Sequence, residues 1–272
     1  KQVFLWLRCL FLSIMIISSW NVNSVRARIN NIKEYLKKSS PDIVMMQEIK
    51  TEEKNYPFDE FKSLKYESYV FGQKSYNGVA FVSKSKLINI KQNIFKDKMK
   101  QSRIISGELT HKKKKINLIN IYTPNGNPVD TEKYDYKLYW LDSFIKTIKK
   151  NLKENGNIII GGDFNIIPAA EDVHNPKSYE NDALFRLEIR KRFREIINLG
   201  FFDTYRYIYP DKEGYTFWDY MSGAWQKNNG MRIDHFLVSS SLIDSIKDVK
   251  INKYPRGREK PSDHTPIEIT ID

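Results

Sequence analysis

The sequence predicts an α/β fold, a sandwich in which mixed β-sheets carry helices on their outer faces. Short runs of β-branched and other apolar residues recur along the 272-residue chain, and amphipathic helical patterns lie between them. The two kinds of segment do not alternate regularly, as they would in a purely parallel βαβ sheet. The chain shows no internal repeat, low-complexity linker or Pro/Gly-rich hinge, so we expect one domain over residues 15–272.

Seven apolar runs predict strands, and most are nearly continuous, as in central strands that are covered on both faces. They are Ile16–Trp20, Ile43–Met46, Gly78–Ser83, Ile116–Tyr122, Asn157–Ile160, Ile233–Val238 and Pro266–Ile271. A further strand is expected around Glu108–Leu109. The basic run Lys112–Lys115 then suits a solvated hairpin tip better than a DNA-binding patch.

Three amphipathic patterns predict helices, at Val25–Lys38, Tyr134–Glu154 and Leu184–Leu199. Gly200 follows the third pattern. It is a candidate C-cap, because glycine readily adopts the left-handed conformation that ends many helices.

The charge balance favours a polyanionic partner. The chain has 45 Lys and Arg against 33 Asp and Glu, a formal net charge of +12, and basic side chains gain affinity by releasing the counterions condensed on nucleic acid. Solubility and a composition rich in Lys, Asn and Ile are the alternative explanation. The single cysteine, Cys9, cannot form an internal disulfide, so we expect a cytoplasmic protein.

The first 17 residues are apolar and begin with a lysine, so a signal peptide is one alternative. Arg8 interrupts the apolar run, no small-x-small cleavage site precedes Ser18, and the run is shorter than the roughly 20 residues needed to cross a bilayer. We therefore expect Met15 to be the true start and residues 1–14 to be an upstream extension. A secreted or membrane-anchored protein is the weakest alternative.

Three of the predicted strands are followed by polar residues that suit phosphate chemistry. Asn21 and Asn23 follow the first, and a spacing of two places both on one side of an extended strand. Glu48 follows the second and offers the hard oxygen ligand that Mg²⁺ prefers. Tyr122 closes another strand, and its hydroxyl can donate to a phosphate. Helix capping, an ordinary surface glutamate and a packing tyrosine are the simpler alternatives.

The segment Ile158–Asn165 is the most specific single signal. Three isoleucines predict a buried strand, and Gly161 and Gly162 allow a tight turn or a close approach to a ligand. Asp163 and Asn165 then emerge together, an acid that can take a proton from water and an amide that can hold the water. An Asx-turn is the simpler alternative.

Two segments near the C-terminus combine aspartate with histidine. A buried Asp beside a His orients the ring and keeps it protonated. Asp263 and His264 are adjacent and can point in different directions, so we assign the orienting role to Asp234. His235 alternates with Asp234 along the predicted strand, and we predict a structural role for it.

Taken in order, these segments resemble the exonuclease III family of AP endonucleases over residues 15–272. The matching segments are Trp20–Arg28, Gln47–Glu48, Tyr122–Gly126, Gly162–Asn165, Arg232–Asp234 and Ser262–Pro266. Deoxyribonuclease I, inositol-phosphate phosphatases and mRNA deadenylases share Gln-Glu, Gly-Asp-x-Asn and Ser-Asp-His. The first segment and Thr216–Tyr220 resemble the DNA-repair branch in particular.

The resemblance implies a four-layer α/β sandwich of two mixed β-sheets flanked by helices, with the site at one rim. It implies roles for nine side chains: Glu48 as the main metal ligand with Asn23 and Asp263 near the metal, Asp163 activating water with Asn165 beside it, Asn21 and Tyr122 at the phosphate, and Asp234 paired with His264. It also implies DNA contacts from Arg26 and Asn175, and apolar walls of an abasic pocket from Phe217, Met231 and Ile233.

We therefore expect a Mg²⁺-dependent nuclease, with Mn²⁺ as a substitute metal. It would hydrolyse the phosphodiester 5′ to abasic sites and trim DNA from 3′ ends. Its partner would be double-stranded DNA, and it would be a monomer without stable membrane association. One alternative is a phosphodiesterase of the same fold that acts on RNA or inositol phosphates. Another is a DNA-binding module without turnover.

Overall fold

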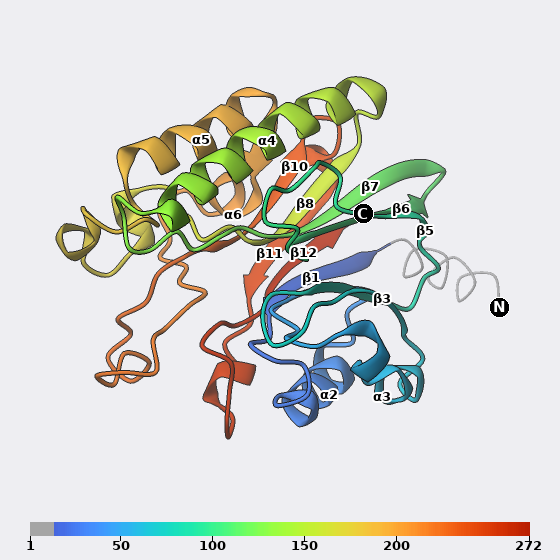
Figure 1. Cartoon of the computed structure of the whole chain (residues 1–272). Helices are drawn as coiled ribbons and strands as arrows, with labels where there is room; N and C mark the ends of the chain where they lie inside the picture. The colour runs from blue at the N-terminus through green and yellow to red at the C-terminus, as the bar shows by residue number, and fades with distance from the viewer. Residues whose placement is uncertain (1–13) are drawn as a thin grey trace.

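Residues 14–272 are described by a computed structural model, and within this range the strands form two six-stranded sheets (Figure 1). The first has the order β11-β12-β1-β2-β4-β3 and the second β5-β6-β7-β8-β10-β9. Residues 1–13, and with them most of the expected extension, lie outside the described residues.

The first sheet comprises β1 (Met15–Asn21), β2 (Ile43–Gln47), β3 (Glu67–Phe71), β4 (Val79–Ser83), β11 (Ile246–Ile251) and β12 (Ile267–Ile271). The second comprises β5 (Ile88–Gln92), β6 (Ile104–His111), β7 (Lys114–Tyr122), β8 (Ile158–Asp163), β9 (Phe201–Asp203) and β10 (Asp234–Ser239). The helices are α2 (Ile29–Ser39), α3 (Phe58–Lys62), α4 (Glu132–Glu154), α5 (Leu187–Asn198) and α6 (Thr204–Ile208). Short 3₁₀ helices are η1 (Glu53–Asn55), η2 (Ala170–Asp172), η3 (Pro176–Tyr179), η4 (Ile243–Ser245) and η5 (Pro255–Gly257).

Four layers result, because each sheet is apolar on both faces. A core that includes Ile17 and Met45 of the first sheet and Ile159 and Phe236 of the second fills the space between the sheets. Helices α2 and α3 cover the outer face of the first sheet, and α4 and α5 cover the outer face of the second (Figure 1). The expected sandwich of two mixed sheets flanked by helices is confirmed.

Each sheet has one parallel pair at its centre. Strand β1 runs parallel to β2, and β7 runs parallel to β8. Strands β12 and β10 lie antiparallel to β1 and β8, respectively. At one edge of the sandwich, the C-terminal ends of the four parallel strands therefore lie beside the N-terminal ends of two antiparallel ones.

Gly161 permits a close approach of the two sheets rather than of a ligand. A Cβ atom at this position would lie 2.5 Å from the Phe236 ring and 2.7 Å from the Met45 sulfur, which belongs to the opposite sheet. The expectation of a turn at the two glycines is therefore wrong, because both lie within β8. A larger residue at Gly161 would push apart the sheets that together form the site.

The inner strands were predictable, and the edge strands were not. All seven predicted strands occur, as does the hairpin between β6 and β7, whose turn falls at Lys112 and Lys113. The predicted helices occur with shifted ends: α2 begins at Ile29 rather than Val25, and α5 begins at Leu187 rather than Leu184. Gly200 has a φ of +104°, as expected of a C-cap. Within residues 14–272, no helix is both long enough and apolar enough to cross a bilayer.

Candidate active site

The edge where the parallel pairs end gathers side chains that are far apart in the sequence. Asn21 is the last residue of β1, and Glu48 directly follows β2. In the second sheet, Tyr122 ends β7 and Asp163 ends β8, and their Cα atoms are partners in the parallel ladder. Parallel pairing thus carries the ends of consecutive strands to one place in each sheet, and the packing of the sheets brings the two places together.

Asn21 joins the two halves of the site. Its Nδ2 donates to Glu48 Oε1 at 2.8 Å and to Asp163 Oδ2 at 2.9 Å, and its Oδ1 accepts from the backbone N–H of Asn23 at 3.1 Å. Asn21 is fully buried. The amide therefore has a hydrogen-bond partner at each end and holds two carboxylates at a fixed separation.

His264 is held by Asp234 from behind. Asp234 begins β10 opposite Asp163 in the antiparallel ladder, and its Oδ2 lies 2.8 Å from His264 Nδ1. Burial alone would lower the pKa of His264, but the Asp234 and Asp163 carboxylates more than offset it and raise the pKa to about 10. The ring is therefore an imidazolium at neutral pH, with Nε2–H directed to the site.

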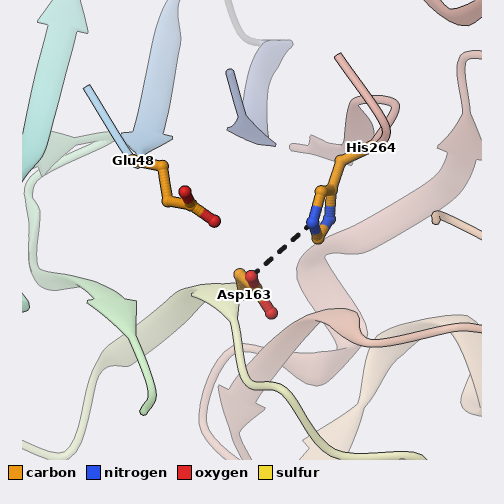
Figure 2. A group of neighbouring side chains, drawn as sticks. All are labelled: Glu48, Asp163 and His264. Atoms are coloured by element: carbon orange, nitrogen blue, oxygen red, sulfur yellow. Dashed lines mark ion pairs between the residues drawn. The ribbon is translucent and has the colours of Figure 1, made fainter. Parts of the chain in front are cut away.

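Asp163 is the buried acid of the site. His264 Nε2 lies 3.8 Å from Asp163 Oδ2, and Figure 2 shows Glu48, Asp163 and His264 pointing toward one another. Burial raises the pKa of Asp163 to about 7, although the imidazolium of His264 opposes this shift. A carboxyl group that titrates near neutrality is suited to taking a proton from water.

Asn165 fixes one oxygen of Asp163. Its backbone N–H donates to Asp163 Oδ1 at 2.8 Å, and its Nδ2 donates to the carbonyl of Thr123 at 2.9 Å. This is the geometry of an Asx-turn, the simpler alternative in the sequence, and it occurs here together with the cluster of acidic groups.

Glu48, Asp163 and His264 offer ligand atoms within 4.8 Å of one another, which makes this cluster a candidate metal site in the described chain. A protonated histidine cannot ligate a cation, however, so the oxygens are the better donors. Lys50 shows where a cation fits: its Nζ lies 2.8 Å from Glu48 Oε2 and 2.6 Å from Asn23 Oδ1. These are carboxylate and amide oxygens, the donors that Mg²⁺ takes in proteins, so the residues fit this metal.

Glu48 is ready to act as an anion. Burial raises the pKa of its carboxyl group, but the Lys50 ammonium and the Asn21 amide more than offset this, so the pKa lies below its usual range. Glu48 also has a φ of +48°, an uncommon conformation for a glutamate. Asp263 lies on the far side of Asn23, whose Nδ2 donates to Asp263 Oδ1 at 3.0 Å.

Tyr122 contributes a hydroxyl from beside Glu48. Burial and the nearby Glu48 and Asp163 carboxylates hold the pKa of Tyr122 well above its usual value. The guanidinium of Arg103 packs over its ring at 4.7 Å from the centroid. Tyr122 is therefore a neutral donor at any physiological pH.

An apolar cluster borders the site on the side of His264. The Phe217 ring packs edge-on against the His264 ring with centroids 4.9 Å apart. Met231 and Ile233, the other two predicted pocket walls, are buried in the same cluster. The remaining members are Ile167, Val173, Tyr179, Leu184 and Phe185.

Other predicted residues lie around this centre. Arg26 and Asn175 are exposed, and among residues 14–272 no side-chain hydrogen bond or ion pair joins them to the acidic cluster. His235 is fully buried, with Nδ1 2.9 Å from Arg232 and Nε2 3.0 Å from the Ile166 carbonyl, a structural environment as expected. Asn23 does not continue the strand, because its φ of +46° is left-handed. Its Oδ1 and Glu48 Oε2 both contact Lys50 Nζ, so Asn23 lies beside the carboxylate that Asn21 also contacts.

Two residues of the site were missed in the sequence. Lys50 follows Glu48 by two positions, and that spacing was a usable signal. Tyr220 closes the segment Thr216–Tyr220 noted above, but no role was assigned to it. Its hydroxyl accepts from Asn23 Nδ2 at 3.3 Å and donates to the Pro261 carbonyl at 2.9 Å, contacts that only the fold creates.

Comparison with known proteins agrees with this geometry. A model of the endonuclease/exonuclease/phosphatase family matches residues 18–264. The exodeoxyribonuclease of Bacillus subtilis is 33% identical over 257 residues, which cover 93% of this chain and 98% of that protein. An AP endonuclease structure from Archaeoglobus fulgidus superposes with a TM-score of 0.89 at 33% identity, covering 95% of this chain and 99% of that one. A 3′ phosphatase from Neisseria, solved with a product DNA hairpin, gives a TM-score of 0.89 at 30% identity over 95% and 99% of the two chains. The chain belongs to the endonuclease/exonuclease/phosphatase family, and its relatives there are exonuclease III and AP endonucleases.

Proposed function

We propose that this protein is a Mg²⁺-dependent DNA-repair nuclease that hydrolyses the phosphodiester 5′ to abasic sites and trims DNA from 3′ ends. The observation that carries the proposal is the pairing of Asp163, an acid with a pKa of about 7, with the imidazolium of His264 across 3.8 Å. A base for water and a cation for the phosphate thus lie side by side.

Asp163 takes the proton from the attacking water. Its Oδ1 accepts from the Asn165 amide and its Oδ2 from Asn21, so the carboxylate is held in one orientation before the substrate binds. Such fixed placement removes much of the entropic cost of bringing the reactants together.

Charge that develops on the phosphate oxygens meets two donors, and each such donor contributes up to roughly 3 kcal/mol in related sites. His264 donates through Nε2–H, and Tyr122 supplies a hydroxyl. Both Nδ2 protons of Asn21 are taken by Glu48 and Asp163, so Asn21 positions the two carboxylates. Glu48 and Asn23 would hold Mg²⁺ through their oxygens, with Asp263 behind Asn23. When bound, the metal polarises the phosphate and stabilises the leaving oxygen.

The apolar cluster beside His264 supports an abasic substrate. Phe217, which is partly exposed beside His264, lies in front of the buried Met231 and Ile233, and we propose that this apolar wall receives a flipped sugar that carries no base. The net charge of +12 and the exposed Arg26 and Asn175 suit the duplex backbone. The Archaeoglobus and Bacillus relatives, an AP endonuclease and an exodeoxyribonuclease, point to the same substrates.

The deciding experiment is incision of a labelled duplex that carries one abasic site, with Mg²⁺ and with EDTA. The expected product ends in a 3′-hydroxyl and appears only with the metal. Duplexes with a recessed 3′ end or a 3′-phosphate test end trimming and the activity named for the Neisseria relative. Turnover of RNA or inositol phosphates alone would favour the non-DNA phosphodiesterase. Tight binding without cutting would favour a DNA-binding module.

A further inference from the structure

Helix α4 carries a lysine whose side-chain nitrogen is entirely inside the protein. Lys137 is fully buried. Its Nζ donates to three backbone carbonyls, those of Asn125 at 2.9 Å, Asn165 at 2.6 Å and Ala183 at 3.0 Å. Burial lowers the pKa of Lys137 to about 7. In its protonated form the amine has three protons, so each carbonyl receives one. No carboxylate of the described residues forms an ion pair with it at 4.0 Å or less.

The three carbonyls belong to three segments that border the site. Asn125 lies in the segment that follows Tyr122 at the end of β7, and Asn165 lies two residues beyond Asp163. Ala183 directly precedes Leu184 of the apolar cluster beside His264. The Lys137 side chain therefore links three segments. They are the one that follows Tyr122, the turn that contains Asp163, and the one that precedes Leu184 of the apolar cluster.

The bond to Asn165 acts on Asp163 through a short chain of contacts. Asn165 has a φ of +49°, a left-handed conformation. In this conformation its backbone N–H reaches Asp163 Oδ1 at 2.8 Å, and its Nδ2 reaches the Thr123 carbonyl at 2.9 Å. Lys137 holds the carbonyl of this same residue, and so opposes a rotation that would release the carboxylate.

Lys137 is closely surrounded by its neighbours, which indicates that it does more than fill space. A Cβ atom at Gly126, whose φ is +87°, would lie 2.6 Å from Lys137 Cδ, so the loop closes directly on the lysine stem. Burial of a charge is costly, and an apolar chain of the same length would fill the space at lower cost. What only the ammonium supplies is the simultaneous hold on three carbonyls.

We infer that Lys137 is a positioning residue, which fixes the Asp163–Asn165 turn relative to Tyr122 and the apolar cluster. It does not touch the substrate. This inference rests on the proposed nuclease activity, because its effect is expressed through Asp163.

The test replaces Lys137 by methionine, which keeps the length and removes the donors, and by glutamine, which keeps two donors. Lys149→Met, an exposed lysine of the same helix, is the matched control. All proteins are assayed on abasic duplex with saturating Mg²⁺, at a temperature where circular dichroism shows them folded.

We expect kcat to fall about ten-fold or more for Lys137→Met, since a displacement of ~1 Å can cost up to 100-fold. The kcat of Lys137→Gln should lie between the values of the parent and of Lys137→Met. The dissociation constant for duplex in EDTA should stay within roughly three-fold, because the side chain of Lys137 is fully buried.

Hydrogen exchange provides a readout that does not depend on turnover. The amides of Thr123, Asn165 and Leu184 should exchange faster in Lys137→Met and not in Lys149→Met. A folded methionine variant with the parent kcat and unchanged exchange would overturn the inference. So would a loss of kcat that matches an equal loss of folded, DNA-binding protein. If the parent protein cuts no DNA, the proposed function fails instead, and the exchange measurement alone decides the role of Lys137.

Discussion

Replacing Asp234 by asparagine tests the charge state on which the proposed chemistry depends. The substitution keeps the shape and an oxygen facing His264 Nδ1, now 2.8 Å from Asp234 Oδ2, but removes the negative charge. Burial then acts on the imidazolium with Asp163, Asp263 and Glu48 left to oppose it. The pKa of His264 should therefore fall from its present value of about 10.

The size of the effect follows from the structure. The pKa of His264 lies at about 10 rather than 6.5, a rise worth about 5 kcal/mol at ~1.36 kcal/mol for each unit. A single opposite charge at this range accounts for about 1–3 units. The proposed role needs the protonated ring, so activity is lost as the pH rises through the pKa of His264. In the variant this loss of activity should begin at a pH about 1–3 units lower than in the parent.

The assay is kcat/KM for incision of an abasic duplex between pH 6 and 10, at saturating Mg²⁺. In the parent the rate should rise as Asp163 deprotonates near pH 7 and stay level until His264 deprotonates near pH 10. In Asp234→Asn the rate at pH 9 should be roughly two-fold to 100-fold below its maximum, as follows from a pKa lowered by about 1–3 units. Asp244→Asn, an exposed carboxylate, is the control. A variant whose basic limb coincides with that of the parent would refute the assignment of His264 as a protonated donor held by Asp234.

Three further outcomes are expected. Asp163→Asn should lower kcat by roughly 10²–10⁴-fold and leave duplex affinity in EDTA unchanged, and incision at the parent rate would remove Asp163 as the base. Glu48→Gln should raise the Mg²⁺ concentration for half-maximal rate by about ten-fold or more, because it removes a charged ligand, and an unchanged midpoint in the titration would exclude Glu48 as that ligand. Arg232→Met should lower the free energy of unfolding in urea by about 3–5 kcal/mol, because it leaves Asp172 buried without its bidentate partner. Exposed Arg194→Met should change it little, and an equal loss in both variants would contradict the reasoning.

The fold could be predicted where burial is complete. All of the strands predicted as full runs lie inside their sheets, where both faces are covered and the apolar run is continuous. The four strands that were missed, β3, β5, β9 and β11, are the four edge strands. β5 is largely exposed, and β9 is only three residues long. The apolar pattern of these edge strands is weak, because backbone pairing with a neighbouring strand, rather than burial, sets their place in the sheet.

The residue types of the site were also visible in the sequence, because Asn21, Glu48 and Asp163 stand at the ends of apolar runs that predict buried strands. Their grouping in space was not visible there. Asp234 could be preferred to Asp263 as the partner of His264 by reasoning on adjacency, but only the pairing of β10 with β8 sets Asp234 opposite Asp163. Lys137 shows the limit most clearly, because within an amphipathic helix it is one more lysine.

By itself the sequence determined which segments are buried and which chemical groups stand at their ends, because burial and strand breaks leave local patterns. The tertiary structure alone decided which of those ends meet, how Asn21 bridges two carboxylates, and that three loops share the ammonium of Lys137. Those contacts join residues up to 142 positions apart, and the interactions that select them, sheet register and the packing of one sheet on another, have no local signature.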